Sequence, residues 1–174
     1  MGIQGSGRVV RDQRGLELIV ERRVPLSGDD TWEWLTAPAK LRKWAGSRRG
    51  KVAVGGTFDF TMTAEEGSPT MSVILEACEP GERYTIAFGE GTDVWRLTIS
   101  LADLGATTAV YLKQRLANAK DAGSIGPGWE WYLDRMMAAI AGTGMPDFDE
   151  YLTVQRPYYE RLAMDGDPVS WPPS

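Results

Sequence analysis

Five short segments with alternating apolar and polar residues follow one another through the middle of the chain. They span residues 57–63, 71–77, 84–88, 95–101 and 108–112, and short turns rich in Gly, Pro, Glu and Asp separate them. Alternation with a period of two is typical of strands that bury one face of a sheet. Parallel strands would need long crossover connections, so turns this short predict an antiparallel meander of five strands.

The segment before the meander combines one strand with two short helices. Residues 16–24 alternate as a strand and are followed by Pro25. Ser27 then provides the side chain of a helix N-cap, and residues 31–35 read as a first short helix. Pro38 opens a second short helix, because proline is favoured at the first helical position.

The segment after the meander carries the strongest helical pattern of the chain. Gly-rich residues 123–128 predict a loop, and Gly142 and Gly144 end the helix that follows it. Apolar residues recur there at positions i, i+3, i+4 and i+7, which is typical of an amphipathic helix. These residues are Trp129, Tyr132, Leu133, Met136, Met137 and Ile140.

This order of elements predicts an α+β helix-grip fold. In that fold a curved antiparallel sheet wraps around a long C-terminal helix, two short helices follow the first strand, and a cavity lies between sheet and helix. The sequence predicts a flexible N-terminal leader over residues 1–15 and the helix-grip domain over residues 16–144. A C-terminal extension over residues 145–174 would hold short helices near 147–152 and 158–164.

Four short motifs follow one another between residues 16 and 164. They are Val24-Pro25 with Trp32, Leu35, Thr36, Pro38, Leu41 and Trp44; Val54-Gly55-Gly56-Thr57-Phe58; Leu75-Glu76 with Pro80, Arg83 and Tyr84; and Gly128-Trp129 with Leu133. In these motifs the chain resembles the SRPBCC (START-like) superfamily, in its branch related to the activator of the heat-shock protein 90 ATPase. That superfamily includes ligand carriers, aromatase/cyclases, ligand-gated regulators and co-chaperone-like proteins, so the resemblance predicts the fold and leaves the function open.

Two residue counts limit the chemistry of the chain. There is no histidine, and Cys78 is the only cysteine. Zinc sites, haem with histidine ligation, Ser-His-Asp triads and Cys-His pairs need residues that this chain lacks. A magnesium or calcium site built from carboxylates alone stays open. We therefore assign no catalytic residue, no metal ligand and no cofactor from the sequence, and leave open whether the protein is an enzyme.

A ligand cavity is the functional feature that the predicted fold favours. Seven Trp and seven Met provide bulky, adaptable apolar surface, which suits a pocket with mostly hydrophobic walls. Ordinary core packing is the alternative for each position, and both roles can coexist. The candidate ligand-binding residues are Phe58, Phe60, Met62, Trp95, Leu97, Val110, Gln114, Trp129, Tyr132, Met136 and Ile140.

A few polar and tryptophan positions allow more specific expectations. Gln114 has inward parity, so its amide either needs a partner inside the cavity or lies at a solvent-exposed strand end. Arg22 has a similar parity and either pairs with a ligand carboxylate or ends the strand in solvent. Trp32 and Trp44 are assigned to the hydrophobic core beneath the two short helices, and Trp131 is placed at the rim of the long helix.

The sequence thus predicts binding of a hydrophobic or amphipathic small molecule in a cavity between the sheet and the C-terminal helix. A protein-interaction module of the chaperone-ATPase-activator kind, with a protein as its partner, is the first alternative. A cyclase-like or hydrolase-like enzyme that uses the cavity is the second. A continuous cavity of a few hundred Å³ would favour binding of a small molecule over both alternatives.

Charge and hydropathy limit the remaining partners. Six basic residues between Lys40 and Lys51 read as a solvated face and not as a nucleic-acid interface, because the net charge of −5 would repel phosphates. No apolar run approaches the roughly 18 residues of a membrane span. We therefore expect a cytoplasmic protein without a membrane span, and a homodimer stays open.

Overall fold

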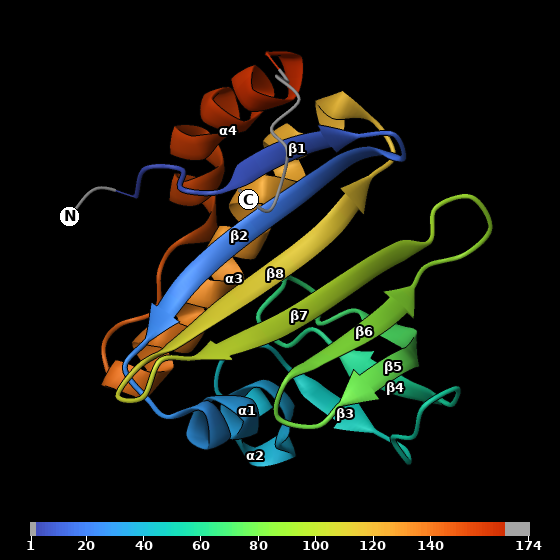
Figure 1. The fold of residues 1–174 in the computed structure, drawn as a ribbon, viewed down its shortest axis with the longest axis vertical. Coiled ribbons are helices and arrows are strands. Elements are labelled where there is room, and N and C mark those ends of the chain that lie inside the picture. The colour runs from blue at the N-terminus through green and yellow to red at the C-terminus, as the bar shows by residue number, and fades with distance from the viewer. Residues whose placement is uncertain (1–2, 166–174) are drawn as a thin grey trace.

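Eight antiparallel strands form one curved sheet in the computed structural model, which describes residues 3–165 (Figure 1). The strand order is β1-β2-β8-β7-β6-β5-β4-β3, so the meander from β3 to β8 is followed by the two strands nearest the N-terminus. The strands are β1 Arg8–Asp12, β2 Gly15–Val24, β3 Ser47–Arg49, β4 Thr57–Thr61, β5 Thr70–Glu79, β6 Arg83–Phe88, β7 Trp95–Asp103 and β8 Thr108–Leu116.

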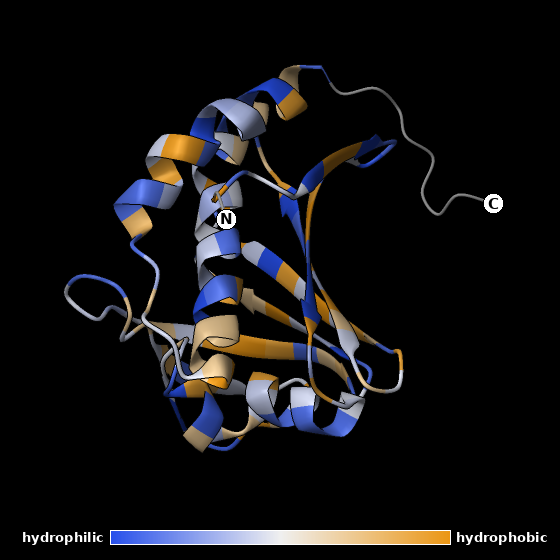
Figure 2. Ribbon diagram, turned by 90° about the vertical axis from the view of Figure 1, so that its left-hand side faces the viewer, coloured by the Kyte–Doolittle hydropathy of each residue, from blue (hydrophilic) through white to orange (hydrophobic). Residues whose placement is uncertain are grey.

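The helices cover one face of this sheet. The long helix α3 stands against the sheet, and α4 lies on its outer side (Figure 2). Helices α1 and α2 lie together at one end of the molecule, below β7 and β8 in Figure 1. The helices are α1 Gly28–Thr36, α2 Pro38–Leu41, the short 3₁₀ helix Ala119–Asp121, α3 Ala122–Ala141 and α4 Phe148–Met164.

The predicted helix-grip architecture is confirmed. The five-strand meander, the strand before it, the two short helices and the long helix occur in the expected order. Local sequence explains several of their boundaries. The Ser27 hydroxyl accepts a hydrogen bond from the Asp30 amide at 3.2 Å at the start of α1, and Gly142 takes the left-handed conformation, with φ of 70°, at the end of α3.

The prediction of a flexible leader over residues 1–15 is wrong for its second half. Arg8–Asp12 form β1, which pairs with β2 along its whole length. The Ser6 and Gly7 amides also donate hydrogen bonds to the Glu130 carboxylate, at 2.6 and 3.0 Å. These partners lie on other elements, so the polar, Gly-rich sequence of the segment gave no local sign of them.

Helix α3 begins at Ala122, seven residues before Trp129, and so includes all of residues 123–128, which were predicted to be a loop. Its early glycines allow close packing against α4: a Cβ atom at Gly126 would lie 2.5 Å from the Tyr159 ring. A Cβ at Gly123 would lie 2.8 Å from the Glu160 side chain. The glycines therefore serve helix contact and not helix termination.

The two short C-terminal helices predicted near 147–152 and 158–164 are one continuous helix, α4. Pro157 lies inside it and is exposed. A proline removes one backbone hydrogen bond, but the helix continues because its buried side chains, among them Tyr151 and Tyr159, pack into the main core. No helix within residues 3–165 is long and apolar enough to cross a membrane.

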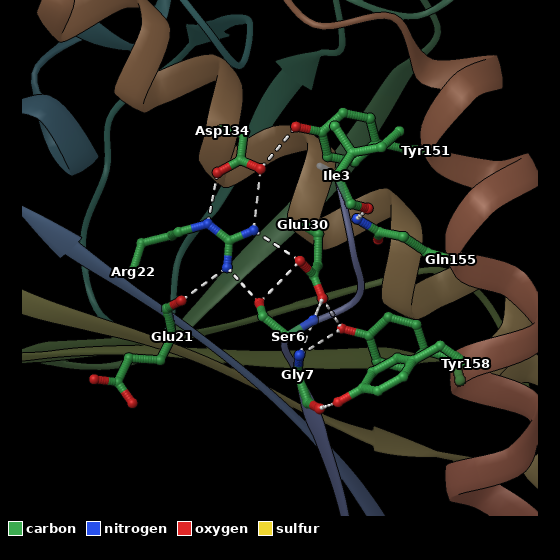
Figure 3. Close-up of polar contacts among 11 residues, drawn as sticks. Ile3, Ser6, Gly7, Glu21, Arg22, Glu130, Asp134, Tyr151, Gln155 and Tyr158 are labelled. Atoms are coloured by element: carbon green, nitrogen blue, oxygen red, sulfur yellow. Dashed lines mark hydrogen bonds and ion pairs between the residues drawn. The ribbon is translucent and has the colours of Figure 1, made fainter. Parts of the chain in front are cut away.

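A partly buried ionic network joins β2, α3, α4 and the N-terminal segment (Figure 3). Arg22 binds Glu130 at 2.7 Å and Asp134 at 2.5 Å, and the Glu130 side chain is fully buried. Glu130 also accepts a hydrogen bond from Tyr159, and Asp134 accepts one from Tyr151 at 2.8 Å. Arg22 is therefore neither a ligand-binding residue of the cavity nor an exposed strand end.

The network predicts acid-sensitive stability. Burial raises the pKa of Glu130, but hydrogen bonds from Tyr159, the Ser6 amide and Arg22 together outweigh it and hold that pKa below its ordinary value. Because the folded pKa is below the value of about 4.3 in the unfolded chain, this stabilisation is complete above about pH 5 and is lost as the pH falls through the folded pKa. Urea unfolding from pH 3.5 to 6 should show this loss, and Glu130→Gln should flatten it. The exposed control Glu90→Gln should keep the wild-type slope, and an equal slope in Glu130→Gln would contradict the assignment.

Candidate functional site

A cavity of about 330 Å³ lies between one face of the sheet and helices α1 to α3. Inward side chains of β4 to β8 form one wall, and residues of α1, α2 and α3 form the other. Nearly all of these side chains are apolar or aromatic. Protein interiors leave few voids larger than a water molecule, so a space of this size is not ordinary core packing.

An outer groove of about 820 Å³ adjoins the cavity. Its walls include the turn between β4 and β5, the turn between β6 and β7, the first half of α3 and the start of α4. Groove and cavity share the side chains Met62, Met71, Phe88, Trp129 and Tyr132. This sharing places the outer groove at the mouth of the cavity.

Six of the eleven sequence-predicted site residues line the cavity. Alternation along the strands directs four of them inward, and the other two lie one turn apart on α3. Their role in ligand binding remains a prediction. These residues are Phe58, Phe60, Met62, Leu97, Trp129 and Tyr132.

Trp95 does not line the cavity, although it has the same parity as Leu97. It is the first residue of β7 and is 38% exposed, with its ring centroid 5.8 Å from that of Phe88. Strand parity gives the face of the sheet but not how far along the strand the cavity extends. Trp95 lines the outer groove instead.

Gln114 is buried, as one of its two sequence interpretations requires, but its partner is a protein side chain. The indole Nε1 of Trp129 donates a hydrogen bond to Gln114 Oε1 at 2.6 Å. Gln114 is 2% exposed and is absent from the cavity wall. The pair joins β8 to α3 and orients the Trp129 ring that lines the cavity.

The other three predicted residues, Val110, Met136 and Ile140, belong to packed regions. Val110 and Met136 are completely buried in the main core, and Ile140 packs against that core at the end of α3. Only the turns of α3 near Trp129 and Tyr132 adjoin the cavity, because farther along the helix the core is filled. The continuous apolar stripe on α3 did not mark where the cavity ends.

One tryptophan of α1 also differs from expectation. Trp44 is buried, as predicted, and its Nε1 donates to the Trp34 carbonyl at 2.9 Å. Trp32, however, is half-buried and lines the cavity, with its ring edge-on to Tyr84. Trp131 lines the outer groove at the mouth of the cavity, in agreement with its expected rim position, although it is 6% exposed and its Nε1 donates to the Pro146 carbonyl at 2.9 Å.

Sequence reasoning missed two polar residues of the cavity wall. Arg48 lies on the short strand β3, which its charged sequence did not suggest, and Tyr84 lies on β6. The Tyr84 hydroxyl donates to the Leu35 carbonyl at 3.3 Å. The alternation of β6 could have identified Tyr84, whereas only the pairing of β3 with β4 places Arg48 inward.

The phenols of the cavity wall are held in their neutral form. Burial raises the pKa of Tyr84, and burial together with Glu65 raises the pKa of Tyr132. The Tyr132 hydroxyl donates to Glu65 Oε1 at 2.7 Å, at the mouth of the cavity. Within residues 3–165, no cluster of Cys, Asp and Glu side chains is placed to hold a metal ion.

Several solved structures resemble this fold. CalU16 from Micromonospora echinospora superposes with a TM-score of 0.73 at 21% identity, over 91% of this chain and 96% of CalU16. A protein from Bordetella parapertussis superposes with a TM-score of 0.70 at 20% identity, over 90% of this chain and 91% of that protein. DynU16, from the dynemicin biosynthetic locus, gives 0.65 at 16% identity, over 76% of this chain and 50% of DynU16.

Sequence comparison leads to a family assignment. No curated protein sequence matches the chain. A family model described as activator of Hsp90 ATPase homolog 1-like protein matches residues 25–141, which run from the end of the first long strand to the end of α3. This match includes most of the cavity wall and more than half of the chain. The chain therefore belongs to the activator of Hsp90 ATPase homolog 1-like family, a branch of the SRPBCC superfamily.

Proposed function

We propose that this protein binds a hydrophobic or amphipathic small molecule in the cavity between its sheet and helices. The observation that carries the proposal is the cavity itself, with a volume of about 330 Å³ and walls that are almost entirely apolar. Pockets for small molecules typically measure about 300–1,000 Å³ and are lined mainly by hydrophobic and aromatic side chains with a few polar groups.

The outer groove supports the same proposal, because it provides a route between solvent and the cavity. Trp95 and Phe148 present partly exposed aromatic rings on its walls, each 38% exposed. Aromatic rings at the mouth would contact an apolar ligand as it enters. The fold neighbour DynU16 comes from a biosynthetic locus, a setting in which a small-molecule ligand is reasonable.

A cavity-filling substitution tests the proposal. Ile86 is half-buried on β6 and lines the cavity, so Ile86→Trp should fill part of the space. We expect it to weaken binding of the neutral dye N-phenyl-1-naphthylamine by about tenfold or more, since 1.4 kcal/mol of lost contact energy corresponds to tenfold. The measurement is a fluorescence titration of each folded variant.

The matched control is Ile74→Trp. Ile74 lies on the adjacent strand β5, is 44% exposed and is absent from the cavity wall, so this variant should bind the dye as the wild type does. Thermal unfolding of both variants checks that they fold. Absence of saturable dye binding to folded wild-type protein would contradict the proposal and favour the alternative of a protein-interaction module.

A further inference from the structure

Arg48 brings a guanidinium group to the wall of an otherwise apolar cavity. On β3 it pairs with Phe60 of β4, and residues paired across two strands have side chains on the same face of a sheet. Phe60 and Arg48 accordingly both line the cavity. Arg49, the next residue, is exposed and pairs with Asp59, which is also exposed.

The Arg48 side chain has no partner within residues 3–165. Its Nε atom is buried and donates a hydrogen bond to no oxygen of the described residues. Arg22, Arg83, Arg96 and Arg115 differ in this respect, because each binds at least one carboxylate. Buried donors are nearly always satisfied, so an unsatisfied guanidinium nitrogen in a cavity points to a group outside the protein.

Three other polar groups of the cavity wall have partners within the protein. The Trp129 indole donates to Gln114, the Tyr132 hydroxyl to Glu65 and the Tyr84 hydroxyl to the Leu35 carbonyl. Arg48 is the one charged residue among the described residues that line the cavity. A ligand inside would therefore meet one cationic donor and a wall of hydrocarbon and aromatic surface.

The charged residues closest to Arg48 in the chain are all basic. Residues 1–51 contain 11 Lys and Arg against 6 Asp and Glu, although the whole chain is acidic. Arg42, Lys43, Arg49 and Lys51, close to Arg48 in the chain, are all exposed. A local positive potential attracts anions, even where the protein as a whole has a negative net charge.

Resting on the proposed function, we propose that the ligand is an amphipathic organic anion whose carboxylate binds Arg48 and whose apolar part fills the cavity. The guanidinium group can donate two parallel hydrogen bonds to one carboxylate, which gives both energy and orientation. The apolar remainder would lie against the aromatic side chains of β4 to β6 and α3.

A pair of probes with the same chain length separates charge from apolar contact. Octanoate and 1-octanol have similar apolar parts, but only octanoate is charged at pH 7.5. We expect wild-type protein to bind octanoate about tenfold or more tightly than 1-octanol, as hydrogen bonds to charged groups allow. Dissociation constants come from displacement of N-phenyl-1-naphthylamine and from calorimetry.

Variants assign the preference to Arg48. Arg48→Gln should weaken octanoate binding by about tenfold or more and leave 1-octanol binding almost unchanged. Arg48→Lys should retain part of the preference, because it keeps the charge but not the planar pair of donors. The control Arg49→Gln, which removes an exposed and salt-screened charge from the same strand, should weaken octanoate binding far less than Arg48→Gln does and leave 1-octanol binding unchanged.

The possible results are distinguishable. If 1-octanol and octanoate bind equally well, and Arg48→Gln changes neither, the cavity binds ligands but Arg48 does not select anions, and the inference is wrong. If neither probe binds to folded wild-type protein, the proposed function itself fails. Unchanged binding of 1-octanol to Arg48→Gln also shows that this variant keeps an intact cavity.

Discussion

Replacing Arg22 with methionine is expected to lower the free energy of unfolding by about 3–5 kcal/mol. The substitution removes the cation that Glu130 and Asp134 share, and the Glu130 side chain is fully buried. A buried carboxylate that has lost its cation destabilises the folded state by more than the intact ion pair stabilises it, because its charge is then neither hydrated nor compensated. Urea unfolding at pH 7, followed by tryptophan fluorescence, measures the loss.

The matched control is Arg115→Met on β8. Arg115 binds Asp12 at 2.6 Å, but both side chains are partly exposed, and such pairs contribute little to stability. This variant should unfold at nearly the wild-type urea concentration. An equally small effect of Arg22→Met would show that the network does not hold the N-terminal segment, α3 and α4 together as the contacts indicate.

Removing Trp34 is expected to be as damaging as removing Arg22. Trp34 is 8% exposed in the main core, and its carbonyl oxygen accepts the indole hydrogen bond of Trp44. Truncating a buried tryptophan to alanine usually costs about 3–5 kcal/mol, and each kcal/mol lowers the melting temperature of a domain of this size by about 2–4 °C. We therefore expect Trp34→Ala to melt about 10 °C or more below the wild type.

Trp32→Ala provides the matched comparison on the same helix. Trp32 is half-buried and lines the cavity, so its removal should cost less than half as much stability but should weaken dye binding. Calorimetric melting and dye titration of the two variants separate core from cavity. If Trp32→Ala were the less stable of the two, the rotation of α1 about its axis would be wrong.

These two tryptophans show that the sequence predicted helix α1 but not which of its faces meets the core. The N-cap at Ser27 and the helical pattern after it predicted α1 correctly. Two tryptophans two positions apart on one short helix cannot both face the core, since they lie about 200° apart around its axis. Which of them the core accepts depends on the direction from which the sheet approaches the helix, and that direction is a tertiary property.

The glycines and prolines show the same limit. As local signals they indicate helix ends, and Gly142 does end α3. Gly123 and Gly126 instead allow α4 to approach α3, and Pro157 lies inside α4. A sequence pattern cannot tell a glycine that breaks a helix from one that makes room for a second helix.

The candidate site divides in the same way. Strand alternation and helical spacing were sufficient to place Phe58, Phe60, Leu97, Trp129 and Tyr132 on inward faces, because the side-chain direction follows from the backbone period. The length of the cavity along each element was not predictable. Met136 and Trp95 lie on the predicted faces of α3 and β7 but outside the cavity. Met136 is in the packed core, and Trp95 is at the mouth of the cavity.

The sequence by itself thus determined the order of β2, α1, α2, β4 to β8 and α3, the antiparallel sheet and the face that these strands bury, since these depend on local periodicity and turn chemistry. Only the tertiary structure decided the partners of the polar residues. Gln114 meets Trp129, Arg22 meets Glu130, and Arg48 meets no partner in the described chain. The physical reason is that a buried polar group is satisfied by whatever lies within about 3 Å of it. Distances across a sheet and between helices do not appear in the order of residues along the chain.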